Sequence, residues 1–169
     1  GFKIIDAINT HFKLSKQKPK FKGLLTTGSI DEKKIYAIKP LTFMNNSGTA
    51  IKELIDYFKI DAKDVFVFHD DLDIDFGKIK AKFGGSSAGH NGIESIDKFI
   101  GKDYSRVRIG IGHPKQKKKV NNHVLEDFKE DEEEKITEIT DNIVKQLPTL
   151  IGKKIDLFSS KVNQNLNGI

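Results

Sequence analysis

The stretch VFVFHDDLDIDFG, Val65–Gly77, decides the fold that the sequence predicts. Its apolar positions as far as Phe68 predict a short strand covered on both faces, which is typical of the centre of an α/β sheet. Four acids follow it directly: Asp70, Asp71, Asp73 and Asp75. Because open α/β sheets bind ligands beyond the carboxyl ends of their strands, the sequence predicts a functional site at this point.

The segments around this stretch alternate between strand and helix patterns. FKGLLTTGSI and KKIYAIK predict two strands joined by a turn at Asp31 and Glu32. NNSGTAIKELIDYFKI and IESIDKFIG predict helices, whereas KIKAKF and RVRIGIG predict two further strands. The predicted fold class is therefore α/β, a single domain with a twisted mixed β-sheet flanked by helices on both faces.

Both ends of the chain show helical spacing. Apolar residues between Phe2 and Phe12 predict an opening helix. Near the other end, EDFKEDEEE is expected to begin a helix, because acids favour a helix N-terminus. Its apolar stripe from Ile136 to Leu147 is expected to end at Pro148, and LIGKKIDLF then resumes the pattern.

Composition excludes several classes of protein. The 169 residues include no cysteine, so disulfides, thiolate zinc sites and cysteine nucleophiles are absent from the sequence. No apolar run reaches the roughly 18 residues that a membrane span needs. The net charge is +5, and lysines gather in KQKPKFK, residues 16–22, and in HPKQKKKV, residues 113–120. Each cluster fits either a solvated surface or a polyanion-binding surface.

The acids after the central strand fit either a metal site or an acid that orients a base. Asp70, Asp71 and Asp73 could supply oxygen ligands to Mg²⁺ or Ca²⁺. In an extended segment, however, Asp71 and Asp73 point away from Asp70, and no zinc-type histidine spacing is present, so we expect no metal. Asp70 at the strand end suits a carboxylate that orients an imidazole, and the other acids suit turns.

Two further loops, KPLTFMNNSG and FGGSSAGHNG, carry amide side chains. Asn45, Asn46 and Asn91 fit helix capping, and they also fit recognition of a peptide backbone, because an amide offers a donor and an acceptor. The glycines of the second loop would let a ligand approach the backbone closely. This loop matches neither the dinucleotide fingerprint nor the P-loop.

Taken together, these strings resemble bacterial-type peptidyl-tRNA hydrolases. The resemblance lies in TFMN at 42–45, HDDLD at 69–73, GHNG at 89–92 and RIGIGHP at 108–114, and in spacing it covers nearly the whole chain. It implies a cytoplasmic, monomeric hydrolase without a metal or other cofactor and without a membrane anchor. Its partner is peptidyl-tRNA, held by the acceptor stem and the peptide, whose ester bond it cleaves.

The resemblance also implies roles for individual residues. Phe43 and Asn45 match substrate-binding positions. Asn91 matches the asparagine that binds the peptidyl end and helps to position the attacking water, and His90 lines the same crevice. Asp70 matches the acid that stabilises the catalytic histidine.

The implied contacts to tRNA phosphates are basic side chains, which tolerate shifts in position. They are Lys80, Lys82, Arg106, Arg108 and the lysines after Pro114.

One position departs from the family pattern. The opening GFKIID aligns with the glycine and helix that follow the catalytic histidine, which would stand three residues ahead of Gly1. The domain over residues 1–169 is thus expected to lack its N-terminal strand and catalytic-histidine loop, and by itself to be inactive. Within the chain, His90 is the only reasonable substitute base.

Two rival functions remain open at the level of the sequence. A non-catalytic RNA-binding relative of the same fold would not need the histidine, although Asp70, Asn45 and Asn91 would then have no joint purpose. A metal-dependent hydrolase would use the aspartates, and a strong chelator would abolish its activity.

Overall fold

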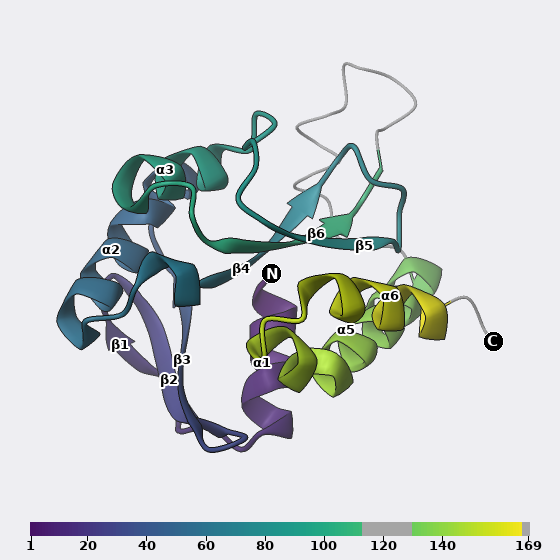
Figure 1. Ribbon diagram of the computed structural model, residues 1–169, viewed down its shortest axis with the longest axis horizontal. Coiled ribbons are helices and arrows are strands. Elements are labelled where there is room, and N and C mark those ends of the chain that lie inside the picture. Colours follow the sequence, from purple (N-terminus) through teal and green to yellow (C-terminus); the bar gives the residue numbers. More distant parts are fainter. Residues whose placement is uncertain (113–129, 167–169) are drawn as a thin grey trace. The chain divides into compact units, whose positions relative to one another are not determined.

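The computed structural model describes residues 1–112 and 130–166 (Figure 1). The chain divides into two compact units. The first unit holds Gly1, Phe68–Ala81 and the described residues from Val107 onward. The second unit holds Phe2–Val67 and Lys82–Arg106.

The second unit begins with helix α1 (Phe2–His11) and an antiparallel sheet of order β1-β2-β3. The strands are β1 (Lys18–Lys20), β2 (Gly23–Ile30) and β3 (Lys33–Pro40). Asp31 and Glu32 form the tight turn between β2 and β3 with φ of 49° and 67°. The predicted hairpin is confirmed, whereas β1 was not predicted, because three exposed residues of sequence KPK carry no apolar alternation.

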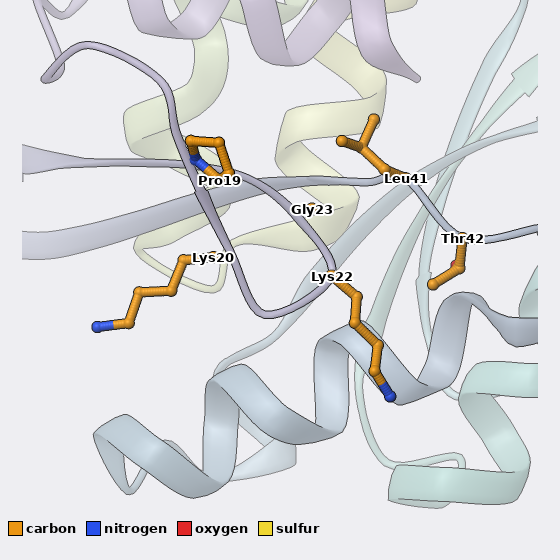
Figure 2. Close-up of a pocket in the computed structure, with 6 residues that line it drawn as sticks. All are labelled: Pro19, Lys20, Lys22, Gly23, Leu41 and Thr42. Atoms are coloured by element: carbon orange, nitrogen blue, oxygen red, sulfur yellow. The ribbon is translucent and has the colours of Figure 1, made fainter.

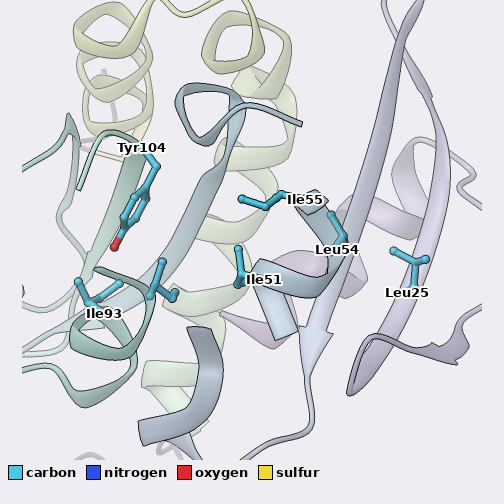
Figure 3. Packing of buried hydrophobic residues seen from close by; sticks show 7 residues of the cluster. Leu25, Ile51, Leu54, Ile55, Ile93 and Tyr104 are labelled. Carbon is cyan, nitrogen blue, oxygen red and sulfur yellow. The ribbon is translucent and has the colours of Figure 1, made fainter. Parts of the chain in front are cut away.

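Two helices cover part of this unit: α2 (Ser47–Phe58), preceded by the 3₁₀ turn η1 (Met44–Asn46), and α3 (Asn91–Ile100). A second 3₁₀ turn, η2 (Ala62–Asp64), follows α2. Figure 3 shows Leu54 of α2 on the side of Leu25 of β2, and Ile55 on the side of Tyr104. The core cluster consists of Leu25, Ile51, Leu54, Ile55, Ile93, Ile96 and Tyr104.

Gly48 allows α2 to approach α3 closely. A Cβ at this position would lie 2.3 Å from the carbonyl oxygen of Ser95, which is too close for any side chain. The Gly48 N–H donates to Ser95 Oγ at 2.9 Å. The start of α2 is thereby fixed against the middle of α3.

A second sheet has the order β4-β6-β5, with β4 (Phe66–Asp71), β5 (Ile79–Phe83) and β6 (Ser105–Gly110). The bonds Ser105 N–H to Val65 O and Ile111 N–H to Asp71 O advance in the same direction, so β4 and β6 are parallel. The bonds Gly84 N–H to Tyr104 O and Gly110 N–H to Lys78 O make β5 antiparallel to β6. The α/β class is confirmed; within the described residues the strands form two three-stranded sheets, one antiparallel and one mixed, where we expected a single mixed sheet.

The first unit also contains helices α5 (Glu130–Ile151) and α6 (Ile155–Leu166). The expected end of the helix at Pro148 is wrong, because α5 continues for three residues beyond it. Proline removes one backbone hydrogen bond, but the buried stripe of α5 continues through Leu147 and Leu150, 4% and 0% exposed, and this packing outweighs the loss.

Side chains of α6 form hydrogen bonds with the backbone of β5 in the same unit. Asn163 accepts from the Ile79 N–H at 3.0 Å and donates to the Ile79 carbonyl at 2.7 Å. Ser159 Oγ accepts from the Ala81 N–H at 2.8 Å. The edge of β5 is thus satisfied by a helix, which prevents its pairing with another chain. In the described ranges, every helix is too short or too polar to cross a lipid bilayer.

Candidate functional site

The end of β4 carries the acids that the sequence singled out. His69 and Asp71 are buried, 9% and 8% exposed, whereas Asp70 between them is half-buried, as alternation along a strand requires. His69 Nδ1 lies 2.8 Å from the carbonyl oxygen of Asp70. Gly1 lies against the same strand, since a Cβ at Gly1 would be 2.7 Å from the Phe68 carbonyl oxygen.

Asp71 has a structural partner that sequence reasoning missed. Its Oδ2 accepts from Arg108 Nε at 2.9 Å, and its Oδ1 accepts from the Asp73 N–H at 2.8 Å. Burial raises the pKa of Asp71, but the hydrogen bonds from Arg108 and the Asp73 backbone outweigh it, so the pKa lies below its ordinary value. The predicted turn bond of Asp71 is confirmed, and the carboxylate also holds the Arg108 side chain in one orientation.

His90 is the N-cap of α3. Its Nδ1 accepts from the backbone N–H groups of Gly92 and Ile93 at 3.1 and 3.2 Å. Because Nδ1 accepts these two bonds, the ring hydrogen is on Nε2. Neither nitrogen of the ring then has a lone pair with which to abstract a proton. The capping interpretation of Asn91 is therefore wrong, because Asn91 is the first residue inside the helix and its side chain is exposed.

The two amide loops are brought together within the second unit. Asn45 is exposed on η1, which packs against α3, the helix that begins at Asn91. Phe43, two residues before Asn45, is 84% exposed. Asn46 precedes α2 but makes no capping bond with its side chain. The exposed amides of Asn45 and Asn91 thus lie on adjoining elements and are available to a ligand.

Arg106 does not face solvent, so its predicted contact with a phosphate is wrong. Its side chain is 2% exposed; one terminal nitrogen donates to Asp97 Oδ1 at 2.8 Å and the other to the Ser86 carbonyl at 2.9 Å. Tyr104 also donates to Asp97 Oδ1, at 2.8 Å. Arg106 thereby ties β6 and α3 to the GGSSAGHNG loop. The sequence carried no signal that singled out Arg106, because Arg108 stands two residues further along the same strand and only the fold shows which arginine is buried.

The other basic residues predicted to contact phosphates are Lys80, Lys82, Arg108 and the lysines after Pro114. Lys80 and Lys82 are exposed at alternate positions of β5, so this strand has a basic outer face. Arg108 is 29% exposed. The lysines after Pro114 lie outside the described residues, as do His113 and His123.

Among the residues that the structure describes, the acids do not gather into a metal site. In residues 1–112 and 130–166, no three side chains of histidine, aspartate or glutamate are placed to hold one ion. Asp73 and Asp75 are exposed, and Asp71 is paired with Arg108. The first unit offers the carboxylate of Asp70 and the exposed Lys80, and the second unit offers the exposed amides of Asn45 and Asn91 and the exposed Lys82.

Comparison with known proteins gives consistent matches. A family model described as peptidyl-tRNA hydrolase matches residues 1–168. A peptidyl-tRNA hydrolase of Pelagibacter ubique is 73% identical over 96% of this chain and 88% of its own length, and one of Bartonella quintana is 43% identical over 97% and 85%. A solved structure of the Arg119Gln mutant of peptidyl-tRNA hydrolase from Acinetobacter baumannii has a TM-score of 0.90 at 30% identity, covering 96% of this chain and 84% of that one.

Proposed function

The chain belongs to the peptidyl-tRNA hydrolase family, and from this premise we propose how its residues take part in hydrolysing the ester bond between peptide and tRNA. The match of the family model to residues 1–168 is the observation that supports this activity. The roles below rest on the contacts and exposure of individual side chains.

Asp70 is the acid that orients the general base. In the family pattern the base is a histidine three residues before the glycine that Gly1 matches. The contact of Gly1 with Phe68, two residues before Asp70, supports a histidine of that segment coming within reach of the carboxylate. The carboxylate fixes the ring and stabilises the imidazolium that forms when the base takes a proton.

The reaction is a general-base hydrolysis. The base takes a proton from water as the water oxygen bonds to the ester carbonyl carbon. The bond to the tRNA ribose oxygen then breaks, and that oxygen receives a proton, so the products are free tRNA and a peptide carboxylate. We propose that this proceeds without a metal, in a monomeric cytoplasmic enzyme.

Asn91 and Asn45 bind the peptide part of the substrate. Their exposure on adjoining elements suits bonds to a peptide backbone, which needs a donor and an acceptor together. Phe43, 84% exposed, adds an apolar contact beside Asn45. His90 acts through its Nε2–H as a donor and not as a base, because the cap occupies Nδ1.

Lys80, Lys82 and Arg108 contact the phosphates of the acceptor stem. The two lysines are exposed, and Asp71 holds the Arg108 guanidinium in place through Nε, which leaves its terminal nitrogens for a phosphate. Affinity for tRNA should then fall steeply with salt.

The Asp70→Asn variant tests the assignment. Measured on the complete natural protein in single-turnover assays, hydrolysis should slow by roughly 10²–10⁴-fold, because the base loses its orienting charge. Binding of uncharged tRNA should stay unchanged. Asp75→Asn is the matched control, since Asp75 is an exposed turn acid of the same cluster.

Other outcomes separate the rivals. Loss of tRNA binding with the rate per bound substrate intact would contradict the role of Asp70. A wild-type protein that binds tRNA but releases no peptide would identify a non-catalytic RNA-binding relative. Loss of hydrolysis in a strong chelator would identify a metal enzyme.

A further inference from the structure

A pocket of about 430 Å³ lies in the second unit, away from the acids of β4 in sequence (Figure 2). Lys20 ends β1, Lys22 lies in the turn that joins β1 to β2, and Leu41 belongs to the segment after β3. We call this surface the β1–β2 pocket. Its lining residues are Pro19, Lys20, Lys22, Gly23, Leu41 and Thr42.

The positive charge at this pocket is only partly neutralised. All three residues of β1 are exposed. In the part of the chain that the structure describes, Lys22 pairs with Glu53 at 3.0 Å, but no carboxylate lies within 4.0 Å of the ammonium groups of Lys18 and Lys20. Two neighbouring uncompensated lysines on an exposed strand attract an anion.

Apolar and aromatic groups accompany these lysines. The Lys20 ammonium nitrogen lies 4.4 Å from the centroid of the Tyr57 ring and 5.1 Å from that of Phe21. Tyr57 is 62% exposed and Leu41 is 61% exposed. Lysines alone would describe a solvated surface, whereas lysines beside an exposed ring form the combination that holds phosphates and stacks an unpaired base.

The pocket continues into the candidate site along the chain. Thr42, which lines the pocket, is followed directly by Phe43, the exposed ring of the TFMN segment. An RNA strand that ends near Asn45 could therefore extend along Leu41 toward β1 without leaving the second unit.

From these observations we infer that the β1–β2 pocket is a second RNA contact of this protein, which binds the backbone and an unpaired base of the tRNA substrate. This inference rests on the proposed function, because it names a further contact of the same substrate. Lys20 of the pocket and its neighbour Lys18 on β1 hold phosphates. Leu41 of the pocket and Tyr57, which lies beside Lys20 outside the pocket lining, supply the surface for the base.

The charge part is tested with Lys18→Gln/Lys20→Gln. The matched control is Lys33→Gln/Lys34→Gln, which removes two exposed lysines at the opposite end of the same sheet, where Lys33 pairs with Ile30. Equilibrium binding of uncharged tRNA to the complete protein is measured across a series of salt concentrations. The Lys18/Lys20 variant should bind about tenfold more weakly, with a slope of log K against log salt shallower by about 1.4, and the control should match wild type.

The base part is tested with Tyr57→Leu, for which Tyr57→Phe is the conservative control. Loss of the ring should weaken binding about fivefold or more without changing the salt slope, and phenylalanine should restore it. Equal melting temperatures show that each variant retains the fold, which the exposure of these side chains supports.

The result is read independently of hydrolysis, because the assay uses uncharged tRNA. Equal affinity and slope for the Lys18/Lys20 variant and the Lys33/Lys34 control would overturn the inference, and would leave the pocket to an acidic protein or to solvent. Wild-type binding that fails altogether, with no hydrolysis, would instead overturn the proposed function.

Discussion

Arg106 and Arg108 lie two residues apart on β6, and each pairs with an aspartate, yet their surroundings differ. The Arg106 side chain is 2% exposed and its partner Asp97 is 10% exposed. Arg108 is 29% exposed, although its partner Asp71 is 8% exposed. Each pair lies within its own unit. The sequence had suggested one role for both arginines, namely contact with tRNA phosphates.

Burial, and not residue type, distinguishes Arg106, which has a structural role, from Arg108, for which we propose a contact with phosphate. Arg106 spends its terminal nitrogens on Asp97 and the Ser86 carbonyl, and its guanidinium carbon lies 4.8 Å from the Tyr104 ring centroid. Burial and the bond to Asp97 raise the pKa of Tyr104, which therefore stays a hydrogen-bond donor. Arg108 pairs with Asp71 through Nε, and its side chain is partly exposed.

The largest expected effect tests the buried pair. Arg106→Gln should lower the free energy of unfolding by about 3–5 kcal/mol, because it leaves the Asp97 carboxylate buried without a cation. Urea unfolding followed by circular dichroism measures this loss. Tyr104→Phe, which removes only one hydrogen bond to the same carboxylate, is the control and should cost about 1 kcal/mol. Equal losses for the two variants would show that the Arg106 charge is not what stabilises the loop.

The second prediction concerns the half-exposed pair. Arg108→Gln should cost about 1.5–3 kcal/mol, because Asp71 keeps its bond from the Asp73 N–H and solvent screens part of the change. The same urea series measures it. Unlike Arg106→Gln, this variant should also flatten the salt dependence of tRNA binding. A loss of stability exceeding that of Arg106→Gln would reverse the comparison.

The smallest effect is the response of Asp71 to acid. Its folded pKa lies below the ordinary 3.8, so the folded state favours the carboxylate. The stability that Asp71 contributes is complete above the unfolded pKa and is lost as pH falls through the lower folded value. Melting temperatures between pH 6 and 2 should show the penalty of Asp71→Asn shrinking below about pH 4. In Arg108→Gln, the loss of stability in acid should be smaller, because burial then raises the folded pKa of Asp71 toward its unfolded value with less opposition.

The sequence predicts most elements because their apolar periods are clear. The hairpin at Asp31 and Glu32, the strand before Asp70 and the helix over residues 47–58 all follow from short, regular patterns. β1 escaped prediction because its three residues KPK are stabilised by pairing with β2, which the local sequence does not encode. The helix end predicted at Pro148 was wrong for a similar reason. Burial of Leu150 in the folded protein outweighs the local tendency of proline to end a helix.

Some features of the candidate site could likewise be predicted from the sequence, and others could not. Asp70, Asn45 and Asn91 were predicted from motifs, and the roles assigned to them stay predictions; the structure describes only their exposure and the elements that carry them. The cap by His90 and the pairing of Asp97 with Arg106 could not be predicted from the sequence. Both depend on which side chain the folded loop places beside a buried donor or acceptor. Exposure likewise separated Lys80 and Lys82 from Arg106 only once the strands were placed.

Gly48 gives the site a property that belongs to none of its binding residues. It has room for a hydrogen atom and not for a methyl group before the Ser95 carbonyl, and it follows η1 by only two residues. Asn45 stands on η1, directly before α2, and Asn91 begins α3. The distance between these two elements depends on the close approach that Gly48 allows. A larger residue at this position would push α2 away from α3, and so would change the spacing between the exposed amides of Asn45 and Asn91 although neither side chain is altered.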